Sequence, residues 1–329
     1  MPGSASPGPL VTVIGEALID LLPGRQPRTF TALPGGSPYN VAIGLARLGQ
    51  RVSLMARLSR DAFGGILRDQ AVAEAIELAA APRAAEPTTL AVVSLDDDAA
   101  ASYYFHRHGT ADWQWTDEEI ARAPAQTAVL HFGSIASWTP PGDAHILGLA
   151  RRMRNRGDLM VSYDPNIRPG LLTDRHHARQ RVEAALECAH LAKASAEDIA
   201  WLYPGATAEE VARRWLGLGA ALVVITASAQ GADAFTPRGW SLHRPARRIS
   251  VVDTIGAGDS FTAGLLGSLI ERGLHTPARL PGCPAPELSA VVDDAILVAS
   301  LNCERQGNDP PTAADLESAR RADQAGGPP

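Results

Sequence analysis

The sequence has 329 residues, with 30 basic and 36 acidic side chains and a net charge of -6. Its 45% hydrophobic and 20% charged residues are typical of a globular protein with room for one large α/β domain. Because there is no basic surplus, neither a nucleic-acid backbone nor an anionic membrane surface is expected as a partner.

Cysteine usage and the chain ends favour a cytoplasmic location. Cys188, Cys283 and Cys303 are widely spaced and odd in number, which argues against a disulfide framework or a zinc site and favours free thiols in a reducing compartment. The opening M-P-G-S-A-S-P-G-P lacks the basic and apolar parts of a signal peptide, and no apolar run reaches the length of a membrane span. Residues 1–9 and 317–329 are expected to be tails.

The first predicted elements are a strand, a glycine-rich turn and a helix. Residues 11–14 form an apolar run that suits a buried strand, and residues 15–22 continue it in extended form. P-G-G-S-P then interrupts the chain, and residues 41–48 have helical apolar spacing. Ser37 is the expected N-cap, with Pro38 at the first helical position.

Further along the chain, a hairpin is followed by alternating strands and helices. Residues 90–95 and 102–105 flank a D-D-D-A-A turn, which predicts a hairpin in a small sheet apart from the main one. The alternation after it implies a mainly parallel sheet wrapped by helices, with ligands at the carboxyl ends of the strands. The expected strands are 128–132, 160–163, 190–194, 222–226 and 249–252, and the expected helices are 144–155, 176–188, 208–216 and those that begin at 260 and 288.

The stretch V-V-D-T-I-G-A-G-D-S-F-T-A-G-L-L, residues 251–266, places two glycines and a carboxylate where an extended run gives way to a helix. A dinucleotide fingerprint would need a third glycine where Phe261 stands. A plain turn, with Asp259 capping the next helix, would not need G-A-G before the cap. Phosphoryl transfer is the third interpretation.

Phosphoryl transfer requires both anion-binding donors and a base. The backbone N–H groups of Gly256, Ala257 and Gly258 can surround an anion at a helix start, and Asp259 can accept the proton of an attacking alcohol. Lys193 is the only lysine and no G-K-[ST] occurs, so a Walker P-loop is excluded.

Two signatures resemble those of the ribokinase-like, or phosphofructokinase B-type, carbohydrate kinases. D-T-I-G-A-G-D-S-F is similar to the carboxyl-side signature and G-G-S-P-Y-N-V-A-I-G-L-A-R-L-G to the amino-side one, and the resemblance covers residues 11–311. It implies a sugar or nucleoside kinase that uses ATP and Mg²⁺ in a Rossmann-like, doubly wound α/β domain over residues 10–316. A small β-sheet lid, about 16–34 and 88–112, would serve as a homodimer interface.

The resemblance makes Asp259 the catalytic base and residues 256–258 its anion hole. S-Y-D-P-N-I-R-P resembles a segment of fructokinases and 2-keto-3-deoxygluconate kinases, and F-H-R-H-G-T-A-D resembles the fructokinase lid. The latter kinases commonly have tyrosine where Phe105 stands, so fructose, phosphorylated at a primary hydroxyl, is the preferred substrate. The keto acid, a nucleoside and an idle sugar-binding scaffold are the alternatives. The implied substrate-binding residues are Asp20, Gly35, Gly36, Asn40, Phe105, Arg107 and Arg168.

The nucleotide side departs from the family pattern at several positions. Ser228 replaces the usual glycine and Asn308 the usual alanine, while Ser195 and Asp198 suit a helix cap as well as a phosphate contact. Many members bind potassium near the first motif aspartate, which implies K⁺ at Asp253 and the backbone of Ile255. The implied nucleotide-binding residues are Ser195, Asp198, Thr226, Ser228, Gly231, Ala299, Asn302 and Cys303.

Overall fold

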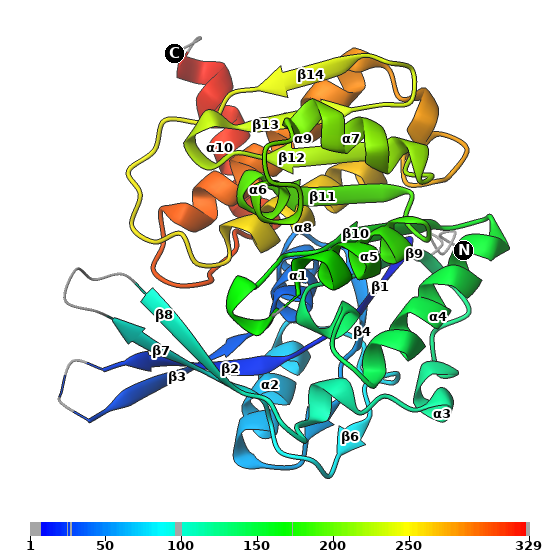
Figure 1. Cartoon of the computed structure of the whole chain (residues 1–329). Coiled ribbons are helices and arrows are strands. Elements are labelled where there is room, and N and C mark those ends of the chain that lie inside the picture. Colours follow the sequence, from blue (N-terminus) through cyan, green and yellow to red (C-terminus); the bar gives the residue numbers. More distant parts are fainter. Residues whose placement is uncertain (1–7, 25, 27, 96–100, 173, 327–329) are drawn as a thin grey trace, which may run out of the picture.

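The computed structural model describes residues 8–24, 26, 28–95, 101–172 and 174–326 (Figure 1). Its main sheet consists of β1 (Leu10–Ile14), β4 (Arg51–Met55), β9 (Thr127–Gly133), β10 (Met160–Asp164), β11 (Leu191–Ser195), β12 (Leu222–Thr226), β13 (Ala232–Phe235) and β14 (Ser241–Arg244). Their order is β14-β13-β12-β11-β10-β9-β1-β4. All neighbours are parallel except β13 and β14, which form an antiparallel edge.

The strand order reverses between β1 and β9. The chain passes from β1 to β4 on one side and later returns as β9 on the other side of β1. Crossovers that leave in opposite directions open a crevice at the carboxyl ends of the strands, where ligands of doubly wound sheets bind. Glu16 follows β1 and Ser134 follows β9, and both line a cavity of about 460 Å³.

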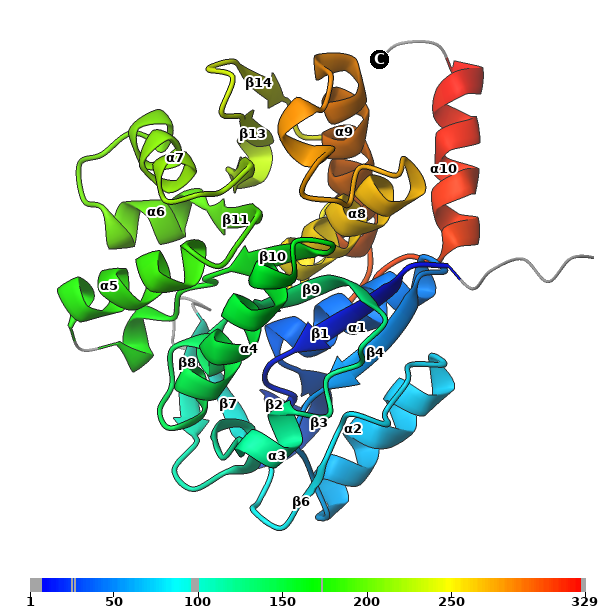
Figure 2. The ribbon, with the colours of Figure 1, turned by 90° about the vertical axis from the view of Figure 1, so that its right-hand side faces the viewer.

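Helices cover both faces of the sheet, as Figure 2 shows with the sheet between two helical layers. On β9, Val129 belongs to one buried cluster and Leu130 to the other, because successive strand residues point to opposite faces. The first face carries α1 (Ser37–Arg47), α8 (Ala257–Glu271) and α9 (Ala285–Cys303), and the second carries α4 (Gly142–Arg156), α5 (Arg175–Leu186), α6 (Ala196–Leu202) and α7 (Ala208–Gly217).

A close helix crossing brings the starts of α1 and α8 together. A Cβ atom on Gly44 of α1 would lie 2.8 Å from the Cβ of Ala263 on α8, which is closer than two carbons can approach. Gly44 therefore permits the crossing. The two helices begin at the same cavity, although their sequences lie more than 200 residues apart.

A second sheet projects from the core at the lower left of Figure 1. It consists of β2 (Leu18–Pro23), β3 (Phe30–Gly35), β7 (Leu90–Leu95) and β8 (Ala101–His106), in the order β3-β2-β7-β8. This is the small sheet predicted from the hairpin pattern, and the D-D-D-A-A turn itself lies at residues 96–100, outside the described residues. We call this sheet the lid.

Shorter elements complete the chain. They are β5 (Leu58–Ser59), α2 (Ala62–Ala73), β6 (Arg83–Ala84), α3 (Asp117–Ile120), α10 (Ala313–Gly326) and 3-10 turns at Ala111–Trp113, Ile135–Ser137, Pro169–Leu171, Ser228–Gln230 and Leu280–Gly282. None of the helices in the described part of the chain combines the length and apolar character that a membrane span requires.

Two expectations about the C-terminal part are wrong. No strand forms at residues 249–252; Val251 and Val252 are 58% and 61% exposed, so their apolar character does not reflect burial in the sheet. The tail predicted from residue 317 is mostly helical, because α10 packs on the core and Arg320 pairs with Asp294 at 2.7 Å. Of the predicted N-terminal tail, residues 1–7 lie outside the described residues.

Candidate active site

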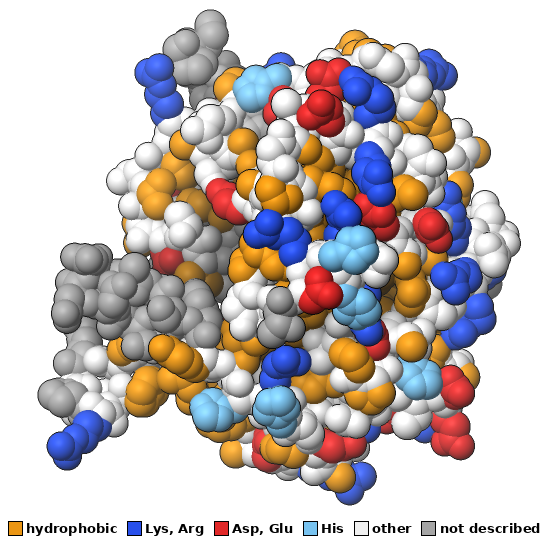
Figure 3. Space-filling model, in the orientation of Figure 1, with side chains coloured by type: hydrophobic (Ala, Val, Ile, Leu, Met, Phe, Trp, Pro, Cys, Tyr) orange, Lys and Arg blue, Asp and Glu red, His pale blue; other side chains and the backbone are white. Residues whose placement is uncertain are grey.

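A cavity of about 460 Å³ lies between the lid and the carboxyl ends of the main strands. The recess beside the lid is visible at the left of Figure 3. The described residues that line it come from the strand ends, the starts of α1 and α8, and the lid: Glu16, Leu18, Asp20, Gly36, Ser37, Asn40, Phe105, Ser134, Ile135, Asn166, Arg168, Thr254, Ile255, Gly256, Ala257, Gly258 and Asp259. Most predicted substrate and catalytic residues are thus brought together, whereas Gly35 and Arg107 are not in this lining.

The G-A-G segment is itself the start of α8. The helix begins at Ala257 with Gly256 as N-cap, so Asp259 is its third residue. A helix that begins at Ser260, capped by Asp259, is therefore contradicted. The first N–H groups of a helix have no partner within it and can face an anion. The Ala257 N–H is partly engaged, since it lies 3.2 Å from the carbonyl oxygen of Thr254.

Gly256 is required at its position for two reasons. Its φ of 74° lies in the left-handed region, where a side chain costs about 1 kcal/mol or more. In addition, a Cβ atom there would overlap the Asn308 side-chain oxygen, because that carboxamide lies directly against Gly256. The glycine therefore sets both the backbone shape of the turn and the approach of Asn308.

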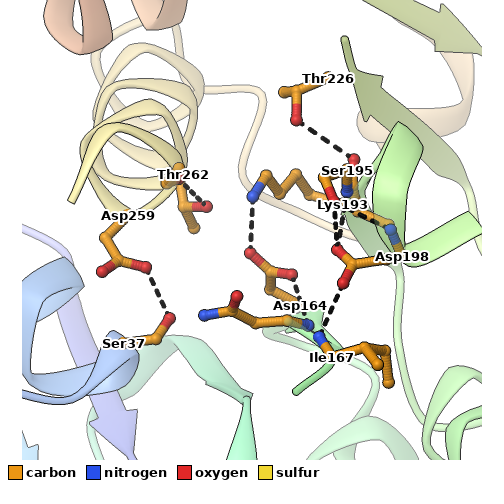
Figure 4. Close-up of polar contacts among 12 residues, drawn as sticks. Ser37, Asp164, Ile167, Lys193, Ser195, Asp198, Thr226, Asp259 and Thr262 are labelled. Atoms are coloured by element: carbon orange, nitrogen blue, oxygen red, sulfur yellow. Dashed lines mark hydrogen bonds and ion pairs between the residues drawn. The ribbon is translucent and has the colours of Figure 1, made fainter. Parts of the chain in front are cut away.

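Asp259 is held by two donors from the start of α1. The Ser37 hydroxyl donates to Oδ1 at 2.7 Å (Figure 4). Asn40 Nδ2 donates to Oδ2 at 2.8 Å. Burial raises the pKa of Asp259 above its ordinary value, although both hydrogen bonds oppose the shift. Ser37 is not the helix cap that the sequence suggested. Gly36 is the N-cap, and the Ser37 hydroxyl is therefore available to bind Asp259.

Asp20 and Arg168 also line the cavity. Burial raises the pKa of Asp20 to about 6, with the charge of Arg168 lowering it and that of Asp259 raising it. Arg168 donates to the Asn166 side-chain oxygen at 2.6 Å. A Cβ atom on Gly35 would overlap the Asp20 carboxylate, so Gly35 makes room for that carboxylate.

Two functional candidates escaped the sequence analysis. Glu16 lines the cavity with its Oε2 bound by the Ala136 N–H at 3.0 Å, and burial raises its pKa. Lys193 Nζ lies 2.8 Å from Asp164 Oδ2, and both side chains are buried. Burial lowers the pKa of Lys193, but the charges of Asp164, Asp198 and Asp259 and the hydrogen bond to Asp164 together raise it. The signal was present, because each is a charged residue next to an apolar run.

Lys193 also approaches the anion hole. A Cβ atom on Gly258 would lie 3.3 Å from Lys193 Nζ. Figure 4 shows Lys193 and Asp164 between Asp259 on one side and Ser195, Asp198 and Thr226 on the other. A protonated amine is therefore positioned next to the G-A-G turn.

The residues predicted to bind the nucleotide lie at and after the ends of β11 and β12 and at the end of α9, and they are not in the cavity lining. Ser195 and Asp198 form a reciprocal helix cap at α6, and Asp198 Oδ1 also accepts from the Ile167 N–H at 2.7 Å. This is the capping interpretation that the sequence left open. Thr226 ends β12 and donates to the Ala194 carbonyl at 3.4 Å.

Ser228 and Gly231 follow β12 in left-handed backbone conformations. Ser228 is exposed with a φ of 46°, a value that explains why glycine is usual there. Gly231 has a φ of 101°, and a Cβ atom on it would overlap the Arg244 carbonyl. Only glycine therefore fits at residue 231.

At the end of α9, the predicted adenine-facing residues have structural roles. Asn302 is 0% exposed, so its side chain cannot face a nucleotide as predicted. The Cys303 carbonyl accepts from the N–H groups of Val252 and Asp253, at 2.8 and 3.2 Å. Ala299 is half-buried and packs against the core.

The predicted potassium ligands already accept hydrogen bonds from N–H groups. Asp253 Oδ1 accepts from the Ile255 N–H at 3.0 Å, and its Oδ2 accepts from the Gly307 N–H at 2.9 Å. The Ile255 carbonyl accepts from Asn302 Nδ2 at 2.8 Å. Each predicted ligand oxygen therefore already faces an N–H donor. Elsewhere in the described chain, no group of three or more His, Cys, Asp or Glu residues is arranged to hold a metal.

A buried carboxylate at a glycine-rich helix start, opposite a buried lysine, defines a phosphotransferase site for an alcohol acceptor. The chain belongs to the pfkB family of carbohydrate kinases, whose family model matches residues 9–314. A fructokinase of Rhizobium leguminosarum bv. trifolii is 34% identical over 275 residues, which cover 82% of this chain and 83% of that protein. A fructokinase of Klebsiella pneumoniae is 33% identical over 281 residues, covering 85% and 89%.

Solved structures agree with this assignment. The Xylella fastidiosa fructokinase with bound ATP has a TM-score of 0.86 and 26% identity, covering 95% of this chain and 99% of that one. A double-mutant fructokinase of Vibrio cholerae O395, with fructose, ADP and a potassium ion bound, has a TM-score of 0.82 and 25% identity, covering 96% and 99%. The predicted family and the α/β fold with a small lid sheet are confirmed.

Proposed function

We propose that the protein is an ATP-dependent fructokinase that transfers the γ-phosphoryl group of MgATP to a primary hydroxyl of fructose. The observation that carries the proposal is the buried Asp259, fixed by Ser37 and Asn40 in a cavity of about 460 Å³ beside the G-A-G turn. Similarity to fructokinases of several organisms supports the choice of sugar.

Asp259 is the proposed base. It accepts the proton of the sugar hydroxyl as the oxygen attacks, and its raised pKa brings it closer to the value that suits a base at neutral pH. The N–H groups at the start of α8 stabilise the charge on the transferred group. Lys193, protonated beside Gly258, adds a positive charge to the same place.

We expect ATP to bind as its complex with Mg²⁺. When bound, Mg²⁺ neutralises charge on the β- and γ-phosphates. It usually takes one or two carboxylates together with phosphate oxygens and water, so it needs no dedicated cage. Asp164 and Asp198, which lie across from Asp259 in Figure 4, are oxygen donors of this type and would hold it.

The cavity chemistry favours a neutral polyol. Two buried oxygens of the lining, Glu16 Oε1 and Asn40 Oδ1, have no hydrogen-bond partner among the described residues, and sugar hydroxyls would supply donors to them. The cavity lining contains three carboxyl groups, those of Glu16, Asp20 and Asp259, and Arg168 is the one basic residue in it. A keto acid would add a further negative charge there, so 2-keto-3-deoxygluconate is disfavoured.

The lid supports a homodimer. Strand pairing places Tyr104 and Val92 on one face, with Phe30 further along it, and Phe105 on the face that lines the cavity. Tyr104 is 63% exposed and Phe30 is 54% exposed, which leaves large apolar side chains on the outer face of the lid. Light scattering of the Tyr104→Glu variant would give a monomer mass if this face holds the dimer.

We also propose a cytoplasmic location. ATP is available there, and the free thiols of Cys188, Cys283 and Cys303 remain reduced in that compartment.

The test is ADP release from MgATP with fructose, 2-keto-3-deoxygluconate, ribose or adenosine as acceptor. Fructose turnover that falls by about 10²- to 10⁴-fold in Asp259→Asn, with sugar binding retained, supports the proposal. Greater turnover on another acceptor would reassign the substrate. Fructose binding by calorimetry without any turnover would indicate an idle sugar-binding scaffold instead.

A further inference from the structure

The Asn302 side chain bridges the end of α9 to the turn that leads into the G-A-G segment. Its Nδ2 donates to the Ile255 carbonyl at 2.8 Å, and its Oδ1 accepts from the Asp309 N–H at 3.1 Å. A backbone N–H can only donate, so the oxygen of the carboxamide must face Asp309. The orientation is therefore fixed, and an N–H group must face Ile255.

This bridge belongs to a set of direct bonds between the two segments. The N–H groups of Val252 and Asp253 donate to the Cys303 carbonyl, and the Gly307 N–H donates to Asp253 Oδ2 at 2.9 Å. Gly256, one residue after Ile255, has the left-handed φ of 74° that starts α8. The conformation of the anion hole is thus fastened to α9 without an intervening ion.

We infer that the Asn302 carboxamide takes the place of a monovalent cation at this turn, so that the kinase reaction of this chain does not require potassium. The inference rests on the proposed function. A structure of a Vibrio cholerae fructokinase contains a potassium ion. In the present chain, the sequence predicted that potassium would bind Asp253 and the backbone of Ile255.

The chemistry of the Ile255 carbonyl and its partner explains why an amide can replace a cation here. A cation is held by oxygen lone pairs, whereas an amide N–H carries partial positive charge at its hydrogen. Asn302 Nδ2 presents such a hydrogen to the Ile255 carbonyl, and both Asp253 oxygens are bonded to N–H groups. A cation that shared the Ile255 carbonyl would lie close to the Asn302 amide hydrogens, and their partial positive charge would repel it. Asn302 is a positioning residue, because it acts through Ile255 and the turn.

The decisive variant is Asn302→Asp, which keeps the size of the side chain but replaces the N–H donor with an oxygen. One carboxylate oxygen still accepts from Asp309, and the other is repelled by the Ile255 carbonyl unless a cation lies between them. ADP release with fructose and thermal unfolding are measured in potassium chloride and in tetramethylammonium chloride at equal ionic strength. Calorimetric titration with potassium chloride gives a direct reading of cation binding.

We expect the wild type to have equal activity and equal melting temperature in the two salts, and no binding heat from potassium. Asn302→Asp should lose about tenfold or more of its activity in tetramethylammonium, as for a buried acceptor left unpaired. Potassium should restore both activity and melting temperature. Asn155→Asp adds the same charge at an exposed position of α4 and should respond alike to both salts.

The inference is overturned if the wild type needs potassium, or if Asn302→Asp behaves alike in both salts. Failure of the proposed function is a separate result. If the wild type phosphorylates no sugar in either salt, the fructokinase assignment fails, while the melting temperatures and calorimetry still decide whether Asn302 replaces the cation.

Discussion

Ser37 donates a hydrogen bond of 2.7 Å to Asp259, joining the starts of two helices across 222 positions of sequence. The bond stabilises the ionised carboxylate and so lowers its pKa against the effect of burial. In Ser37→Ala, the pKa of Asp259 should therefore rise further. The acid limb of the pH profile of kcat/KM should move up by about one pH unit, since a hydrogen bond to a charged group is worth about 1.5 kcal/mol or more.

The high-pH plateau separates this effect from damage to the fold. Once Asp259 is fully ionised, Ser37→Ala should approach the wild-type rate, and Ser37→Thr, which keeps the hydroxyl, should retain the wild-type profile. A uniform loss of rate at every pH would show that Ser37 does not act through the titration of Asp259.

Asp20 should make fructose binding sensitive to pH. Burial raises its pKa to about 6, so the carboxylate that we expect to accept sugar hydroxyls becomes protonated as the pH falls through that value. The dissociation constant of fructose should rise below pH 6, by up to about tenfold per pH unit. Calorimetry in the Asp259→Asn background removes the catalytic titration. Asp20→Asn should bind fructose more weakly and with little dependence on pH. If the fructose affinity of the protein with Asp20 intact is equally independent of pH, Asp20 does not bind the sugar through its carboxylate.

Lys193 should discriminate ATP from ADP. In Lys193→Met, ATP affinity should fall more than ADP affinity and kcat should fall by about 10²- to 10³-fold, as when a charge-stabilising donor is lost. Breaking a buried pair costs about 3–5 kcal/mol, so Lys193→Met with Asp164→Asn is the better-folded comparison. Because the chain has one lysine, protein grown on 15Nζ-labelled lysine gives a single side-chain signal that should shift with ATP. A signal that ATP does not change would show that the Lys193 amine does not contact or sense the bound nucleotide.

Gly256→Ala should impair turnover more than sugar binding. The φ of 74° strains any side chain, and a Cβ atom would also overlap Asn308, so the turn must shift away from its shape. Adding Asn308→Ala removes the overlap but not the strained φ, and should restore part of the activity. A double-mutant cycle measures the coupling. If the two changes are additive, Asn308 does not constrain Gly256.

The sequence alone was sufficient for the fold class and for the centre of the site. The G-A-G-D segment and the amino-side signature are local patterns, and their residues meet because both helices begin at the reversal of strand order. Local spacing could not show that Ser37 binds Asp259 instead of capping α1. That contact depends on the crossing of α1 and α8, which Gly44 permits.

The remaining differences have a similar cause. Asn302 was predicted to bind the nucleotide because of its place in the family resemblance, but its partners come from the loops at Ile255 and Asp309. Residues 249–252 have strand-like composition, yet the N–H group of Val252 bonds to the Cys303 carbonyl at the end of α9 and not to a strand. Tertiary context overrides propensity at such places.

The burial of Lys193 has a practical consequence. Apart from its α-amino group, the folded chain presents no primary amine to an acylating reagent, because its only lysine is 4% exposed and paired with Asp164. Amine-reactive probes, which decorate most proteins at many points, would here modify one internal position and only when the site opens. The rate of that single modification would report how often the packing around the Lys193 amine opens, and its slowing by ATP would show that the bound nucleotide holds that packing closed.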